Sequence, residues 1–109
     1  MDLFENVKVE KNANVYFDGR VTSRNIFFTD GTKKTLGVML PGIYEFGTEK
    51  KEIMEIQSGT LKVLLPDETE WIDIKGGTSF EVPENSKFKL EVLEPVSYTH
   101  LTLPTICSV

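Results

Sequence analysis

Glu52 is the acidic residue of this sequence with the clearest potential for chemistry. Neighbouring residues of a β-strand point to opposite faces, so Glu52 shares a strand face with Met54. In the same way Tyr44, Phe46 and Thr48 share a face of the preceding segment. A carboxylate enclosed among such side chains is costly unless it is paired, protonated or used. If both faces border one hollow, Glu52 would suit acid/base work or the binding of hydroxyl groups. The same pattern is also typical of ordinary core residues.

Basic residues supply a second candidate chemistry. Lys33 and Lys34 directly follow Asp30-Gly31-Thr32, and Arg24 lies in an expected early strand. Cationic side chains together with the N–H groups of a loop can hold a phosphate group. Solvated lysines on a hairpin show the same pattern, and this simpler interpretation is the stronger one for Lys34.

Other common types of active site are not supported by the sequence. His100 is the sole histidine and Cys107 the sole cysteine, which excludes an internal disulfide and a zinc site built from several such ligands. No Ser/His/Asp or Cys/His arrangement is present. The glycines fall at turns and form no glycine-rich phosphate-binding motif.

The elements that must position these residues are predicted to be strands. Apolar and charged residues alternate over residues 88–92 and 60–65, the pattern of half-buried strands. Turn signals such as Pro41-Gly42 recur about every eight to twelve residues, a spacing typical of antiparallel sandwiches and barrels. Residues 50–56 resemble a short helix, but their isoleucines and the following Gly59 favour a strand. The sequence therefore predicts an all-β fold.

Length and charge limit the classes of function. The chain has 109 residues, enough for one domain, and a net charge of −5 disfavours non-specific nucleic-acid binding. No apolar run approaches the roughly 20 residues that span a bilayer. The first residues lack the basic and apolar parts of a secretory signal. We expect a cytoplasmic protein without nucleic-acid or membrane partners.

The last eleven residues, 99–109, differ from the rest of the chain. They contain no acidic or basic residue apart from His100, and residues 96–105 look like a translated sequencing-library adapter. We therefore predict one domain over residues 1–98 and an atypical, non-native tail over residues 99–109. No function is assigned to the tail, and an ordered edge strand is the alternative.

Two segments resemble the paired motifs of the cupin superfamily, small antiparallel β-barrels or jelly rolls that often bind a metal through three His and one Glu. They are residues 52–59, Glu-Ile-Met-Glu-Ile-Gln-Ser-Gly, and residues 77–83, Gly-Thr-Ser-Phe-Glu-Val-Pro. Phe46, Thr48 and Phe88 stand where the pattern has histidines. The resemblance thus implies a single-domain cupin barrel that has kept the glutamate and is metal-free.

Several longer segments resemble the short cupin-type pyrimidine/purine nucleoside phosphorylases of bacteria. They are residues 14–21, 37–46, 58–66 and 80–88 together with Glu70-Trp71, and the resemblance covers roughly residues 12 to 98. It implies phosphorolysis of purine and pyrimidine nucleosides to free base and ribose 1-phosphate, with broad base tolerance. Phosphate would be a co-substrate, no cofactor would be needed, and the protein would form homodimers.

The resemblance also suggests roles for individual residues. Glu52 is the candidate catalytic residue, and Lys33 is the candidate phosphate ligand, assisted by Arg24 or Ser86. The candidate substrate-binding residues are Tyr44, Phe46, Thr48, Asn85 and Phe88.

Two other functions are compatible with the barrel. An apolar cavity with few polar groups also suits a non-catalytic sensor or carrier of a small molecule. A sugar isomerase or epimerase normally uses a histidine base, and residues 1–98 contain no histidine.

Overall fold

The computed structural model describes residues 3–102, and residues 1–2 and 103–109 lie outside the described part. The described residues form eleven strands and one short 3-10 turn, in agreement with the predicted all-β fold. The elements are β1 Lys8–Val9, β2 Asn14–Tyr16, η1 Phe17–Gly19, β3 Val21–Phe27, β4 Lys33–Met39, β5 Gly42–Thr48, β6 Glu52–Ser58, β7 Thr60–Leu64, β8 Ile72–Lys75, β9 Thr78–Val82, β10 Ser86–Val92 and β11 Val96–Thr102.

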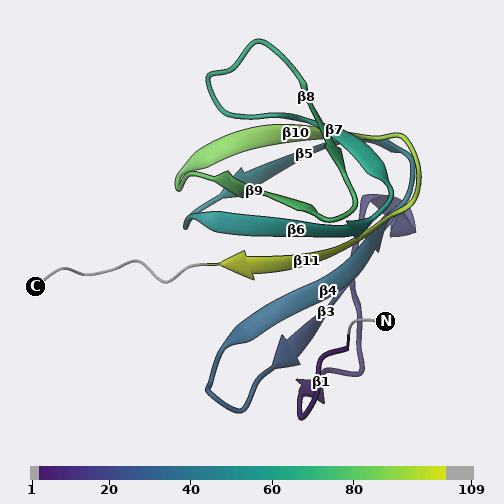
Figure 1. Ribbon diagram of the computed structural model, residues 1–109, viewed down its shortest axis with the longest axis vertical. Helices are drawn as coiled ribbons and strands as arrows, with labels where there is room; N and C mark the ends of the chain where they lie inside the picture. The colour runs from purple at the N-terminus through teal and green to yellow at the C-terminus, as the bar shows by residue number, and fades with distance from the viewer. Residues whose placement is uncertain (1–2, 103–109) are drawn as a thin grey trace, which may run out of the picture.

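The strands build two antiparallel sheets that face each other (Figure 1). The seven-stranded sheet has the order β1-β3-β4-β11-β6-β9, with β2 pairing to β3, and the four-stranded sheet has the order β5-β10-β7-β8. Each sheet therefore turns one face toward the other and one face away. This arrangement confirms the expected small antiparallel barrel.

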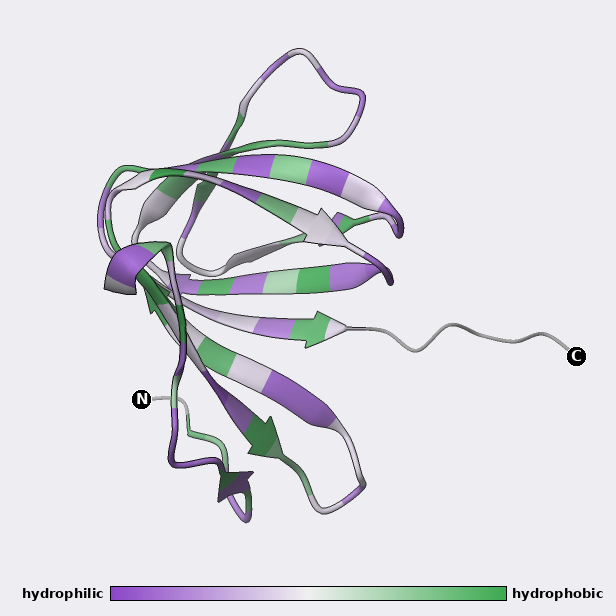
Figure 2. Ribbon diagram, turned by 180° about the vertical axis from the view of Figure 1, so that it is seen from behind, coloured by the Kyte–Doolittle hydropathy of each residue, from purple (hydrophilic) through white to green (hydrophobic). Residues whose placement is uncertain are grey.

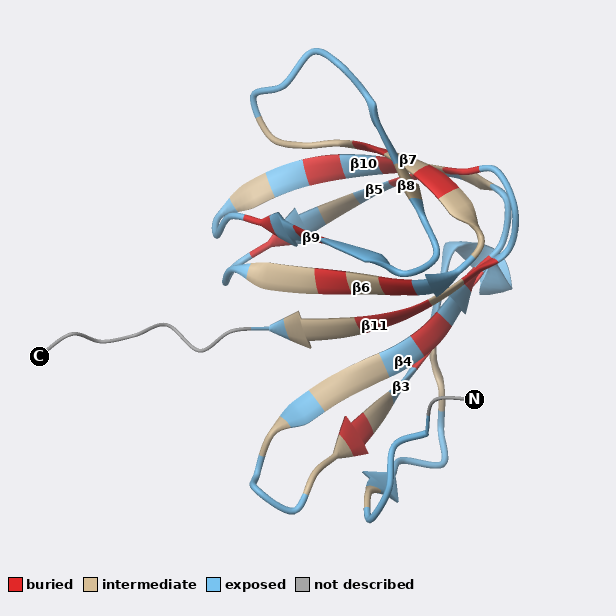
Figure 3. Cartoon of the chain, in the orientation of Figure 1, coloured by how far each residue is buried: buried red, intermediate tan, exposed pale blue. Residues whose placement is uncertain are grey.

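Alternating hydropathy decides which face of each strand is buried. In β10, Phe88, Leu90 and Val92 are buried, and Lys87 and Lys89, which alternate with them, are exposed. The resulting apolar and polar bands are visible along the strands in Figure 2, and the matching buried and exposed bands in Figure 3. Burial of one large apolar side chain contributes about 1.5–3 kcal/mol, so this alternation fixes the strand register.

β6 is a strand, as predicted from its isoleucines, and not a helix. Met54 and Ile56 are buried on its inner face, which Glu52 shares at the beginning of the strand. The strand is followed by Gly59, whose φ of +94° is a left-handed conformation that glycine adopts without strain.

β11 lies in the middle of the larger sheet, between β4 and β6. The domain boundary predicted after Tyr98 falls inside this strand, and residues 99–102 belong to the sheet. The remainder of the predicted tail, with Cys107, lies outside the described residues. A non-native origin of the tail remains a prediction.

The described part of the chain contains no helix of the length and apolar character needed to cross a membrane.

Candidate active site

A cavity of about 830 Å³ lies between the two sheets. Its wall combines apolar side chains from both sheets, among them Met39, Phe46, Met54 and Phe88, with polar side chains from the larger sheet. Apolar surroundings with a few converging polar groups are typical of small-molecule sites. The volume is in the range of known ligand pockets, about 300–1,000 Å³.

The register of the larger sheet arranges its inward side chains in rows from the rim of the cavity to its interior. The outer row holds Lys33 on β4, Thr102 on β11 and Glu52 on β6. The middle row is Asn25, Thr35, His100 and Met54, and the inner row is Asn14, Ser23, Gly37, Tyr98 and Ile56. Exposure falls in the same direction, from an exposed Lys33 to Ser23 and Tyr98, which are each 6% exposed.

Glu52 lines the cavity, as the alternation of β6 predicted. Its side chain is 16% exposed, and Oε2 lies 3.0 Å from Nε2 of His100 on the neighbouring strand. The two atoms are close enough for an ion pair when the imidazole is protonated, but Nε2 lacks the alignment of a hydrogen bond. The carboxylate therefore makes no aligned hydrogen bond with His100, and its oxygens can still accept hydrogen bonds from a ligand in the cavity.

His100 was assigned no function from the sequence, because it lies within the predicted tail over residues 99–109. The structure places it in the cavity wall, with Leu101 and Thr102. The signal that was missed is the inward alternation of Val96, Tyr98 and His100, which continues two residues beyond the predicted boundary.

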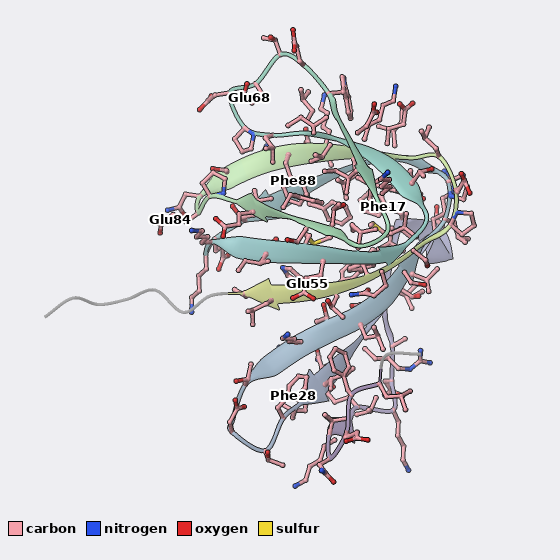
Figure 4. All side chains as sticks on the ribbon, viewed as in Figure 1. Phe17, Phe28, Glu55, Glu68, Glu84 and Phe88 are labelled. Atoms are coloured by element: carbon pink, nitrogen blue, oxygen red, sulfur yellow. The ribbon has the colours of Figure 1, made fainter. Side chains whose placement is uncertain are left out.

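Aromatic rings form one wall of the cavity. The ring centroids of Phe46 and Phe88 lie 5.8 Å apart in a stacked arrangement, and Phe17 from η1 meets Phe46 edge-on at 5.5 Å. Figure 4 labels two of these three rings, Phe17 and Phe88. Phe17 was not predicted for this cluster, since its strand alternation ends in a turn where its φ is +51°. Phe88 is buried and Phe17 does not line the cavity, so Phe46 is the ring of this cluster whose face is available to stack on a planar base.

Tyr44 and Thr48 have structural contacts and do not line the main cavity. The Tyr44 hydroxyl is buried and donates to the Leu40 carbonyl at 2.5 Å. Thr48 Oγ1 donates to the Pro83 carbonyl at 2.7 Å and accepts from the Ser86 N–H at 3.0 Å. These bonds fix the corners of β5 and β10, so the proposed substrate contacts of Tyr44 and Thr48 have no support from their positions.

The candidate phosphate ligands do not converge. Lys33 lines the main cavity, directly after the loop containing Asp30 and Thr32. Arg24 is exposed and alternates with the inward Ser23, so it lies on the outer face of β3. Ser86 and Asn85 line a separate, shallower depression of about 550 Å³. Among the three candidate phosphate ligands, Lys33 alone lines the same cavity as Glu52.

The loop before Lys33 is ordered by a local hydrogen bond. The Thr32 N–H donates to Asp30 Oδ1 at 2.8 Å. This bond, with a contribution from the Thr32 side chain, lowers the pKa of the Asp30 carboxyl. The loop therefore presents Lys33 to the cavity from a defined turn.

A polar cluster in the inner row was missed from the sequence. Asn14 Nδ2 donates to Ser23 Oγ at 3.3 Å, and the Tyr98 hydroxyl makes a long contact of 3.5 Å with the Thr22 carbonyl. Burial, with a smaller effect of Tyr16, raises the pKa of Tyr98 to about 12, against the opposing effect of a hydrogen bond with Ser23. Tyr98 is therefore a neutral hydroxyl group at physiological pH.

Within residues 3–102, no three His, Cys, Asp or Glu side chains gather closely enough to hold a metal ion. Phe46, Thr48 and Phe88, at the positions predicted to have lost histidines, instead pack in the core or bond to backbone.

Relatives of known sequence resemble the chain over nearly its whole length. A family described as pyrimidine/purine nucleoside phosphorylase matches residues 11–100. A protein of that name from Wolinella succinogenes is 60% identical over 98 residues, which are 90% of this chain and 93% of the relative. Another from Leptospira interrogans is 57% identical, over 90% of this chain and 92% of the relative.

Solved structures resemble the chain in fold. A protein of unknown function from Acinetobacter superimposes with a TM-score of 0.90 and 45% identity, covering 93% of this chain and 98% of that chain. The cupin domain of Cnp3 from Schizosaccharomyces pombe has a TM-score of 0.61 at 15% identity, over 84% of this chain and 69% of that chain, a likeness of fold alone. The barrel, the family match over residues 11–100 and the relatives at 57–60% identity thus lead to one conclusion. This cupin-fold chain belongs to the pyrimidine/purine nucleoside phosphorylase family.

Proposed function

We propose that the cavity between the sheets catalyses phosphorolysis of purine and pyrimidine nucleosides, giving free base and ribose 1-phosphate. The observation that carries the proposal is a single cavity lined by Glu52, Lys33 and the stacked rings of Phe46 and Phe88. The names of the relatives, nucleoside phosphorylases at 57–60% identity, support the same reaction.

The reaction requires one bond to break and one to form at the same carbon. The C1′–N bond breaks and its electron pair stays on the base nitrogen, while a phosphate oxygen forms the new C1′–O bond. The proton of monohydrogen phosphate is finally carried by the released base, which balances the reaction. Phosphate is thus a co-substrate, and the proposal invokes no cofactor.

The outer row of the cavity provides the charges that this reaction needs. The Lys33 ammonium would attract phosphate at the rim. The Glu52 carboxylate would accept hydrogen bonds from ribose hydroxyls and stabilise positive charge developing at C1′. Holding both substrates in one cavity would supply a further part of the rate gain by proximity.

The aromatic wall would allow the broad base tolerance that the proposal includes. Every nucleobase has an aromatic face, so stacking against Phe46, the less buried of the two stacked rings, would discriminate little between purines and pyrimidines. Phe88 is 3% exposed, so its ring is already fixed by packing before a base arrives.

Lys33→Ala is expected to raise the KM for phosphate about tenfold, the loss expected for one charged hydrogen-bonding partner near the surface. The measurement is phosphate-dependent release of uracil from uridine at saturating uridine. Arg24→Ala is the matched control, because it removes a cation from the outer face of the adjacent strand. Equal effects of the two substitutions would show that general surface charge, and not the cavity, attracts phosphate.

A non-catalytic sensor or carrier is distinguished by incubating the protein with mixed nucleosides, with and without phosphate. The proposal predicts free bases only when phosphate is present. Thermal stabilisation by nucleosides without release of base would instead identify a binding protein.

We also propose that the protein forms a cytoplasmic homodimer. A small barrel buries limited area, and the outer face of β4 leaves Leu36 and Val38 at 42% and 41% exposure. Light scattering of the purified protein is expected to give twice the chain mass of 12.3 kDa. A measured mass of one chain at micromolar protein concentration would contradict the proposed homodimer.

A further inference from the structure

The inner row of the cavity carries polar groups that the proposed chemistry does not use. Ser23 and Tyr98 are each 6% exposed, and both line the cavity. They lie on either side of Gly37, with Ser23 on β3 and Tyr98 on β11 both paired to this glycine of β4. A Cβ at Gly37 would stand 2.9 Å from the Tyr98 hydroxyl and 3.0 Å from Ser23 Cα. The missing side chain therefore allows the phenol to lie across β4 beside Ser23.

These groups keep unused hydrogen-bonding capacity. The Tyr98 hydroxyl has one long contact of 3.5 Å, and Ser23 Oγ accepts a weak bond of 3.3 Å from Asn14. The Tyr98 and Ser23 hydroxyls also lie close enough for the hydrogen bond that affects the pKa of Tyr98, and the Asn14 carbonyl and one Asn14 N–H have no partner among these bonds. Because these bonds are long and the groups can accept or donate further ones, a ligand in the cavity can add hydrogen bonds to the cluster.

The inner row is separated from the charged rim. Gly37 and Lys33 are four residues apart on β4, which places the two rows about 13 Å apart at about 3.3 Å per residue. The middle row between them contains His100 and the neutral Asn25 and Thr35. A phosphate dianion is better placed beside the Lys33 ammonium than among neutral groups.

We infer that the cluster of Asn14, Ser23 and Tyr98 binds the hydrogen-bonding edge of the nucleobase, so that the nucleoside enters base first. The inference rests on the proposed function and assigns the parts of the substrates to two depths of the cavity. The base turns its hydrogen-bonding edge toward the inner row and its face toward the aromatic wall, and the ribose and the phosphate lie at the outer row, beside Glu52 and Lys33.

The chemistry of the cluster fits both classes of base. Hydroxyl and amide groups can donate or accept, whereas a carboxylate only accepts and an ammonium only donates. Purine and pyrimidine edges both present carbonyl acceptors and N–H donors, in different orders. Reorientable neutral groups therefore accommodate either class, which complements the tolerance given by stacking.

The test compares Ser23→Ala, Tyr98→Phe and Asn14→Ala with the wild-type protein. Each substitution is expected to raise the KM for uridine and inosine, and the inhibition constant of uracil and hypoxanthine, by about tenfold. The KM for phosphate is expected to change less than about twofold, in contrast to Lys33→Ala. Ser97→Ala is the matched control, because Ser97 lies on the opposite face of β11 from Tyr98 and outside the cavity wall. Thermal unfolding identifies any variant that has lost its fold. The kinetic constants of the remaining variants then test the inference.

Unchanged nucleoside and base constants in all folded variants would overturn the inference, as would a rise confined to the KM for phosphate. If the wild-type protein released no base, the proposed function would fail separately. Calorimetric titration with uracil and hypoxanthine would then still test the cluster. Binding to the wild type that is lost in Tyr98→Phe would support the inference, and the absence of binding to the wild type would overturn it.

Discussion

Glu52→Gln is expected to lower kcat/KM for phosphate-dependent release of uracil from uridine by about 100-fold. The substitution keeps the size of the side chain and its ability to hydrogen-bond, but removes the negative charge that would stabilise the cationic C1′ centre. Loss of one preorganised electrostatic contact typically costs about 10²–10³ in rate. Because Glu52 is 16% exposed in the cavity wall, solvent screens this charge less than a surface charge.

Glu55→Gln is the matched control for Glu52→Gln. Glu55 lies on the same strand but on its outer face, where its carboxylate is 47% exposed and 3.8 Å from the Lys34 ammonium (Figure 4). An exposed pair of this kind contributes about 0–1 kcal/mol to stability. We therefore expect wild-type kinetics from Glu55→Gln, and equal losses in both variants would contradict a specific role of Glu52.

Gly37→Ala is expected to lower the free energy of unfolding by about 3 kcal/mol or more. A Cβ at this position would overlap the Thr22 carbonyl oxygen of the neighbouring strand and crowd the Tyr98 hydroxyl. The obstructing atom on β3 belongs to the backbone, so the strain cannot be relieved by a change of rotamer alone. Overpacking of a rigid site costs typically 1–3 kcal/mol and sometimes more, and displacement of a sheet strand belongs to the upper end. Urea denaturation followed by circular dichroism measures the change.

Gly47→Ala serves as the control for backbone flexibility alone. A Cβ at Gly47 would meet its nearest neighbour, the Ser86 carbonyl oxygen, at 3.9 Å, an ordinary contact distance. Both glycines lie within strands, so the two substitutions remove similar freedom from the unfolded chain. We expect Gly47→Ala to change stability by less than about 1 kcal/mol, and a similar loss in both variants would refute the steric explanation.

The strands could be predicted because their burial follows from local alternation. Phe88, Leu90 and Val92 alternate with charged residues. The positions of these apolar residues therefore indicate which face of the strand is buried. Glu52 could be placed in the wall for the same reason, since it continues the inward series of Met54 and Ile56. These features depend on period-two geometry within one segment.

The composition of the cavity could not be predicted in the same way, because it depends on which strands become neighbours. Ser23 and Tyr98 are 75 residues apart in sequence, and they approach each other only because β3 and β11 both pair with β4. Arg24 was grouped with Lys33 by its charge, although one residue of register places it on the opposite face of its strand. The position of β11 was misjudged because its composition is unlike that of the other strands, while its place between β4 and β6 is set by long-range pairing.

The cavity account is tested most directly by identifying the products of uridine turnover by ³¹P nuclear magnetic resonance, with uracil measured in the same sample. The account predicts a sugar-phosphate signal for ribose 1-phosphate that grows in a one-to-one ratio with uracil, and it predicts a slower increase of both in Glu52→Gln. Release of uracil without a phosphate ester, or equal rates of product formation in wild type and Glu52→Gln, would contradict it.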